Sequence, residues 1–166
     1  MQPTDRSEHP NIERVMAAAR AAGVEIAVQR FPEGTRTAQD AAAAVGCEVG
    51  QIVKSLVFVA DGRPVIALVS GTNRLDTSRL ATTLGATAVR RADGDEARAA
   101  TGFAIGGVPP FGHGQRLDVV MDRDLAAWER VWAAAGLPDA VFEISPPQLE
   151  RASGARVADI AERPAG

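Results

Sequence analysis

Residues 102–114 are the part of this sequence best suited to holding a ligand. These thirteen residues include five glycines and two prolines. They cannot form a helix or a regular strand, because glycine permits positive φ while proline fixes φ and lacks an amide donor. We expect a rigid loop that exposes the amides of Gly106 and Gly107 and is anchored by its apolar side chains, Phe103, Ile105, Val108 and Phe111. Such a loop suits a carbonyl or phosphate oxygen of a ligand, although a surface crossover between two elements would have the same composition.

A lysine inside an apolar segment is the second candidate. Lys54 lies within residues 52–59, whose β-branched and apolar side chains predict a strand. Alternation along a strand places Lys54 on one face with Ile52, Leu56 and Phe58. A charged group there must reach water, pair with an opposite charge or point into a polar cavity. It is therefore either an ammonium directed at a phosphate or a developing negative charge, or a lysine near a strand end that reaches solvent.

Two further titratable residues flank the end of the loop. His113 has the chemistry of a general base, but no serine or cysteine is visibly arranged as its nucleophile, and a hydrogen bond to loop backbone is the alternative. Asp118 heads the next apolar segment and is placed to accept loop amides. Cys47 most simply fills a small apolar gap. Two histidines and one cysteine cannot supply a standard zinc site, and no phosphate-binding glycine motif is present, so we expect neither metal nor cofactor.

Helices that position these residues are predicted from capping signals. Residues 1–10 are polar and are expected to fray. Helix starts are indicated by residues that cap well, and glycines at 23, 46, 85 and 102 indicate four of the ends. The predicted caps are Asn11, Thr37 with Asp40, Asp76, Asp93 with Glu96, and Ser145, whose helix runs to about residue 152.

Strands are predicted from alternation and β-branched composition over residues 24–28, 52–60, 64–69, 86–90, 117–121 and 156–160. Asp61-Gly62 makes a hairpin of the second and third of these segments, and residues 32–34 predict a turn.

Residues 124–135 are ambiguous. Leu125, Trp128 and Val131 fit a helix, whereas residues 131–135 could instead pair with residues 140–144. Without an internal repeat or a linker, we predict a single α+β domain over residues 1–166, built on a mixed sheet.

Composition narrows the classes of partner. A net charge of −3, with no tyrosine and 4% aromatic residues, argues against extensive binding of nucleic acid and leaves room only for a small local contact. Arg74, Arg90 and Arg91 are expected to be solvated, unless one of them helps to hold a phosphate. The single cysteine excludes an intramolecular disulfide and indicates a reducing compartment. No secretory signal or membrane-length apolar run is recognisable, so we expect a cytoplasmic protein without a membrane or DNA partner.

Three stretches, taken together in this order and spacing, resemble one family. They are residues 52–58 with Lys54, the polar loop of residues 70–76, and a Gly-x-x-x-Pro element within Gly106-Gly107-Val108-Pro109-Pro110. They are similar to the YbaK/EbsC family, the free-standing relatives of the editing domain inserted in bacterial prolyl-tRNA synthetases. The similarity covers roughly residues 12–162, essentially the whole predicted domain.

The resemblance implies a mixed β-sheet or partly closed barrel flanked by helices. It also implies hydrolysis of the ester that links a wrong amino acid to tRNA. Lys54 would lie where the terminal adenosine of the acceptor end is received, and the loop amides would orient the aminoacyl carbonyl. The other residues assigned to substrate binding are Ser70, Gly71, Asn73, Val108, Pro109, Pro110, His113 and Asp118. We expect Lys54, residues 70–73 and residues 106–110 to converge on one cleft.

One departure from the family pattern concerns the substrate. Many relatives have a small polar residue just before the second proline of the motif, where this chain has Pro109, preceded by Val108. The identity of the amino acid is therefore left open, and hydrolysis of cysteinyl-tRNA for proline is not implied. A synthetase partner could hold the rest of the tRNA.

The chemistry of the ester agrees with the absence of a visible triad. Aminoacyl esters are labile, so positioning and oxyanion stabilisation by the amides of Gly106 and Gly107 can suffice, with a ribose hydroxyl or a held water moving the proton. The expected function is a trans-editing aminoacyl-tRNA deacylase. A catalytically silent module that binds a nucleotide or an acylated ligand in the same pocket is the alternative. A hydrolase of an unrelated small ester, with His113 as base, is the third hypothesis.

Overall fold

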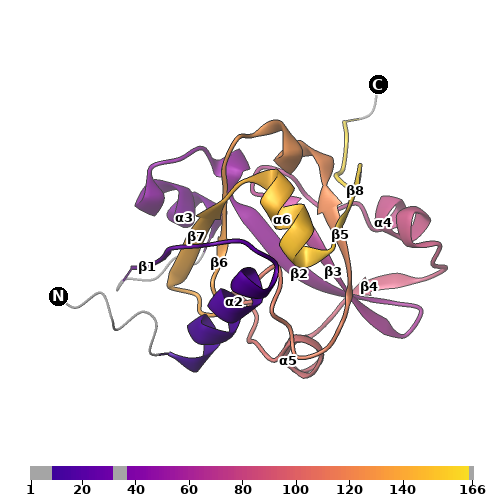
Figure 1. Ribbon diagram of the computed structural model, residues 1–166. Coiled ribbons are helices and arrows are strands. Elements are labelled where there is room, and N and C mark those ends of the chain that lie inside the picture. Colours follow the sequence, from indigo (N-terminus) through magenta and orange to yellow (C-terminus); the bar gives the residue numbers. More distant parts are fainter. Residues whose placement is uncertain (1–8, 32–36, 165–166) are drawn as a thin grey trace.

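The computed structural model describes residues 9–31 and 37–164 (Figure 1). Within these residues, five α-helices surround a five-stranded sheet and a three-stranded sheet. The predicted α+β class with a mixed sheet flanked by helices is confirmed. The turn predicted at residues 32–34 lies outside the described residues.

The larger sheet is built around the predicted hairpin, and its strand order is β4-β2-β3-β5-β8. Strands β2 (Val53–Ala60) and β3 (Arg63–Ser70) pair across Asp61 and Gly62, whose φ values of 49° and 84° match the left-handed turn that closes short hairpins. Strand β4 (Val89–Arg91) runs antiparallel to β2. Strands β5 (Asp118–Asp122) and β8 (Arg156–Ala158) are added in parallel to β3. The sheet is therefore mixed, and β4 covers only one end of β2.

The smaller sheet is antiparallel, with β7 (Ala140–Ile144) between β1 (Val28–Arg30) and β6 (Val131–Ala134). An isolated bridge joins Ile52 to Trp132, and the described strands do not otherwise pair between the two sheets. The barrel therefore does not close, and the free edge of β2 faces β6 across the gap between the sheets.

The helices begin at the predicted caps with one exception. Capping boxes form at Thr37 and Asp93, and the side chains of Asp76 and Ser145 also accept backbone amides. The exception is the first helix, where His9 rather than Asn11 is the cap and Pro10 is the first helical residue, so residues 9–10 do not fray. The helices are α2 (Pro10–Ala21), α3 (Ala38–Val45), α4 (Thr77–Leu84), α5 (Gly94–Thr101) and α6 (Pro146–Ser153).

The structure corrects the strand prediction for residues 24–27 and decides between the two alternatives for residues 131–135. Residues 24–27 alternate in polarity but are not a strand, because the pairing with β7 begins only at Val28. Residues 131–134 form β6 of the β6–β7 hairpin, which corresponds to the second of the two alternatives. Just before it, residues Arg123–Ala127 make a 3-10 helix, and a second such turn covers Val49–Gln51.

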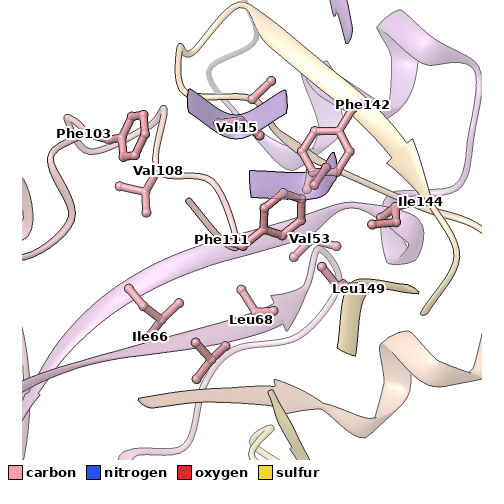
Figure 2. Packing of buried hydrophobic residues seen from close by; sticks show 14 of the residues in the cluster. Val15, Val53, Ile66, Leu68, Phe103, Val108, Phe111, Phe142, Ile144 and Leu149 are labelled. Atoms are coloured by element: carbon pink, nitrogen blue, oxygen red, sulfur yellow. The ribbon is translucent and has the colours of Figure 1, made fainter. Parts of the chain in front are cut away.

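The main core lies between the two sheets and beneath α2, and the loop after α5 is anchored in it. Phe103, Val108 and Phe111 are each at least 96% buried, and the rings of Phe111 and Phe142 lie 5.5 Å apart (Figure 2). Ile105 is the exception, because it is 51% exposed. The predicted anchoring of the loop by its apolar side chains is thus confirmed for three of the four. None of the described helices has the length and apolar character needed to cross a membrane.

Candidate functional site

A cavity of about 300 Å³ opens along the uncovered edge of β2. Strand β4 pairs only with Phe58, Val59 and Ala60, so the first half of β2 has no strand on that side. Helix α3, strand β6 and residues 105–108 of the loop surround this open edge. The lining is mostly apolar, and its polar side chains among the described residues are Thr37, Lys54, Ser55 and Arg91.

Lys54 stands at this cavity and is the only lysine in the chain. Its side chain shares a face with Leu56 and Phe58, as predicted, whereas Ile52 precedes the strand and packs with Trp132 in a separate cluster. The ammonium donates a hydrogen bond of 2.5 Å to the carbonyl oxygen of Asn73. Burial lowers the pKa of Lys54, and the carboxylate of Asp122 opposes this shift. Lys54 is therefore partly buried, and it bonds to a carbonyl oxygen instead of pairing with a carboxylate.

Arg91 adds a second cation to the lining. Its guanidinium lies 5.7 Å from the ring centre of Phe58, a cation–π contact. Neither Lys54 nor Arg91 forms an ion pair with a described residue. The part of the cavity that they line is therefore suited to an anion.

Residues 70–73 support Lys54 from outside the cavity. The Ser70 hydroxyl donates to the carbonyl of Gly50 at 2.7 Å, and a Cβ at Gly71 would overlap the carbonyl oxygen of Val49. The side-chain Nδ2 of Asn73 donates to Asp122 and to Asp124, at 2.8 Å each. Ser70, Gly71 and Asn73 therefore fix the carbonyl that Lys54 contacts instead of lining the space beside it.

The two loop glycines assigned to catalysis differ from one another. The Gly107 amide donates to the carbonyl of Ala104 at 3.0 Å, closing a turn in which Gly106 has φ +95°. Gly107 is buried, and an added Cβ would lie 2.9 Å from the Cα of Leu137. Gly106 is exposed, lines the cavity and has no partner for its amide among the described residues. Only the Gly106 amide is left free to bind a ligand oxygen.

The rest of the motif forms the base of the loop. Val108 lines the cavity and is 4% exposed, while Pro109 and Pro110 are buried behind it. The structure thus brings Lys54, Gly106 and Val108 together, with residues 70–73 directly behind the lysine.

Comparisons with known proteins identify the family of this chain. The model of the aminoacyl-tRNA editing domain matches residues 32–152. This chain belongs to the aminoacyl-tRNA editing domain family. The resemblance to the YbaK-type editing domains is thereby confirmed.

Individual relatives of this editing domain include both free-standing proteins and parts of longer ones. The uncharacterized protein YwhH of Bacillus subtilis (strain 168) is 32% identical over 131 residues, which are 78% of this chain and 83% of YwhH. A proline–tRNA ligase of Geobacter sp. (strain M21) is 34% identical over 106 residues, which are 64% of this chain but 18% of the ligase. The crystal structure of "a putative trans-editing enzyme for prolyl tRNA synthetase" is 47% identical, with a TM-score of 0.88, and the match covers 93% of this chain and 99% of that one.

His113 and Asp118 lie elsewhere in this editing domain. Both line a second hollow, of about 530 Å³, formed by residues 111–119 together with residues 152–156 around the end of α6. The His113 Nε2 lies 2.8 Å from the carbonyl oxygen of Pro109, so that nitrogen carries the proton and donates it. Burial lowers the pKa of His113, which favours this neutral form. Asp118 pairs with Arg63 at 3.1 Å and accepts no loop amide.

Two features of the editing domain were missed in the sequence. Asp122 is fully buried and accepts hydrogen bonds from the Ser70 amide, the Asn73 side chain and the Asp124 amide. An aspartate that ends an apolar strand was the available signal for it. The second is Ser55, whose hydroxyl is buried and has no hydrogen-bond partner in the described part of the chain. No group of three or more His, Cys, Asp or Glu residues in the described part of the chain is placed to bind a metal ion.

Proposed function

We propose that this editing domain is an aminoacyl-tRNA deacylase that acts in trans on mischarged tRNA. In the reaction, water adds to the ester carbonyl and the bond to the ribose oxygen breaks, which releases the free amino acid and a tRNA with its hydroxyl restored. The observation that carries the proposal is a lysine at a mostly apolar cavity that also contains a loop amide, where neither the lysine has a counter-ion nor the amide a hydrogen-bond partner among the described residues.

The size and lining of the cavity suit the acyl end of the substrate. A volume of about 300 Å³ is at the lower end for small-molecule sites, so it fits an aminoacyl group better than a whole aminoacyl nucleotide. The ribose and the phosphate of the terminal nucleotide would then lie against Lys54 and Arg91. Contact with the acceptor end alone is compatible with a net charge of −3.

The mechanism relies on positioning and on one backbone donor. The Gly106 amide is the candidate oxyanion contact, while the Gly107 amide is used inside the turn and holds Gly106 in place. The Lys54 ammonium adds positive charge near the developing oxyanion or the neighbouring phosphate. The adjacent ribose hydroxyl or a held water would move the proton, so His113 has no step to perform.

The comparisons support prolyl-tRNA synthetase as the associated enzyme. One solved relative is described as a trans-editing enzyme for prolyl-tRNA synthetase, and segments of proline–tRNA ligases are similar to this chain. We infer that the substrate is a tRNA misacylated by that synthetase, which would hold the body of the tRNA while the editing domain receives its acceptor end.

A deacylation screen tests the proposal. The wild-type chain, Lys54→Ala and the control Asp118→Ala are incubated with tRNA for proline charged with each of several small amino acids. We expect the wild type and Asp118→Ala to release at least one amino acid at equal rates, and Lys54→Ala to lose about ten- to a hundredfold. A wild type that binds an aminoacyl-adenosine analogue but hydrolyses no ester would instead support the catalytically silent binding module.

A further inference from the structure

Ser55 is the residue of the cavity that the proposed mechanism leaves unused. It follows Lys54 on β2, so its side chain points to the opposite face, between Val53 and Val57 of the main core. Its hydroxyl oxygen is the one buried side-chain nitrogen or oxygen without a hydrogen-bond partner in the described part of the chain. Buried hydroxyls are nearly always paired, so an unpaired one beside a cavity indicates a missing partner.

The backbone of Ser55 also has no partner on the cavity side among the described residues. The Ala92 amide donates to the carbonyl of Val57 at 3.0 Å, so the backbone groups of Val57 face away from β3. Antiparallel pairing alternates by residue, so the amide and carbonyl of Ser55 face the same way. Strand β4 does not extend to Ser55, and the cavity lies there instead. Ser55 therefore presents its N–H and C=O to the cavity, with its covered hydroxyl directly beside them.

We propose that Ser55 determines specificity by hydrogen-bonding the α-amino group of the aminoacyl ester, an inference that rests on the proposed deacylase function. Every aminoacyl ester carries this amino group next to the ester carbonyl, whatever its side chain. The polar side chains of the described lining are Ser55, the cations Lys54 and Arg91, and Thr37, whose hydroxyl already accepts the Asp40 amide at the start of α3. Ser55 thus carries the lining hydroxyl that has no hydrogen-bond partner among the described residues, and it lies beside the space where an acyl group would bind.

The charges of the cavity fit a neutral amine. Lys54 and Arg91 are both cations, and the described lining holds no carboxylate that would favour an ammonium. A serine hydroxyl both donates and accepts, so it suits a neutral amine, which does the same. The hydroxyl oxygen is covered in the unliganded chain, but the residue itself is partly exposed, and rotation between staggered χ1 rotamers can turn the oxygen toward the cavity.

The experiment compares two esters in two proteins. The substrates are tRNA for proline carrying the aminoacyl group that the wild type hydrolyses fastest, and the same tRNA carrying the corresponding acid without its amino group, such as alanyl and propionyl esters. Each rate is divided by the spontaneous hydrolysis rate of that ester, because the amino group itself makes the ester more labile. The proteins are the wild type, Ser55→Ala and Ser55→Thr, which keeps the hydroxyl.

We expect the wild type to prefer the aminoacyl ester by about tenfold and Ser55→Ala to lose that preference, while Ser55→Thr retains part of it. The melting temperature of Ser55→Ala should be unchanged or higher, because the variant removes a hydroxyl that has no partner. A Ser55→Ala protein that keeps the full preference for the amino group would overturn this inference and leave the deacylase intact. A wild type that hydrolyses neither ester nor any other in the panel would overturn the proposed function and this inference with it.

Discussion

The loop that follows α5 contributes to two hollows, and they differ in how their polar groups are satisfied. In the larger hollow, the side chains of His113, Gln115, Asp118 and Ser153 each already bond to another part of the protein. Its two arginines, Arg116 and Arg156, are exposed and form no ion pair with a described residue. In the smaller cavity, no described residue is a counter-ion of Lys54 or Arg91 or a hydrogen-bond partner of the Ser55 hydroxyl or the Gly106 amide. Histidine and aspartate, the usual catalytic residue types, are on the satisfied side.

The larger volume and the presence of histidine and aspartate both point to the second hollow, but the bonding of their polar groups points to the smaller cavity. A polar group that is already bonded within the protein mainly stabilises the scaffold, whereas an unpaired buried group costs free energy until a ligand pairs with it. The smaller cavity contains such a group, the buried Ser55 hydroxyl, next to the Gly106 amide and two cations, and it is therefore the better candidate for chemistry. The following predictions test this contrast, beginning with the largest effect.

Gly107→Ala should reduce deacylation by more than about a hundredfold, because the oxyanion donor would be displaced. The added Cβ would lie 2.9 Å from the Cα of Leu137 and 3.0 Å from the carbonyl oxygen of Gly136, so the turn that presents Gly106 must shift. The matched control is Gly114→Ala, where the nearest atom to the new Cβ, Thr101 O, is 3.9 Å away. Equal deacylation rates in the two variants would contradict the role of the turn.

Lys54→Ala should reduce kcat/KM by about ten- to a hundredfold, the value of one charged contact to the substrate. The side chain is only half-buried, so the melting temperature should fall by less than about 4 °C, which for a chain of this size is about 1 kcal/mol. Full activity in the alanine variant, measured beside circular dichroism to confirm folding, would make Lys54 a purely structural residue.

His113→Ala should cost less than about tenfold in activity, because no proton passes through the imidazole; a general base would cost about 10²–10⁴-fold. The variant loses the hydrogen bond from His113 to the Pro109 carbonyl, so its free energy of unfolding should fall by about 1 kcal/mol. An activity loss above a hundredfold in a folded variant would restore the histidine-based hydrolase.

The pKa of His113 gives a separate test of its structural role. Burial holds that pKa below its ordinary value of 6.5, so the unfolded chain binds a proton first as the pH falls. The contribution to stability is therefore complete above about pH 6.5 and is lost as the pH falls toward the lower folded pKa. Between about pH 7.5 and pH 5.5, urea denaturation should show a smaller loss of stability for His113→Gln than for the wild type.

Asp118→Ala should have the smallest effect. Asp118 and Arg63 keep 55% and 57% of their side-chain surface exposed, and exposed ion pairs contribute at most about 1 kcal/mol. Deacylation should stay within about twofold of the wild type, since the hollow that Asp118 lines has no catalytic role in this account. A larger loss of activity at unchanged stability would bring the second hollow into the site.

The parts of the fold that could be predicted from the sequence are those determined by neighbouring residues. The Asp61-Gly62 turn and the caps at Thr37 and Asp93 each form within about four residues, so the sequence alone identifies them. Residues 24–27 and 131–134 depend on whether a distant strand pairs with them. Polarity cannot supply that information, which is why one segment was predicted wrongly and the other stayed ambiguous.

The site shows the same division. Lys54 and the Gly106 turn are recognisable from residue type, because a lysine in an apolar strand and a double glycine before two prolines are unusual locally. The commitment of the Gly107 amide, the packing of Gly107 against Leu137 and the uncovered edge beside Ser55 arise from contacts between distant segments. His113 and Asp118 are close to the loop in sequence, yet both line the second hollow instead of the cavity.

The contrast between the two hollows can be tested most directly by a crystal structure of the protein with a non-hydrolysable substrate analogue. Adenosine carrying a small amino acid through a 3′-amide in place of the ester is suitable, because it keeps the carbonyl, the α-amino group and the ribose. We predict that the acyl group lies in the β2-edge cavity, with its carbonyl oxygen at the Gly106 amide, its amino group at Ser55 and the ribose near Lys54. An analogue bound instead between His113 and Asp118, with the cavity empty, would contradict the account.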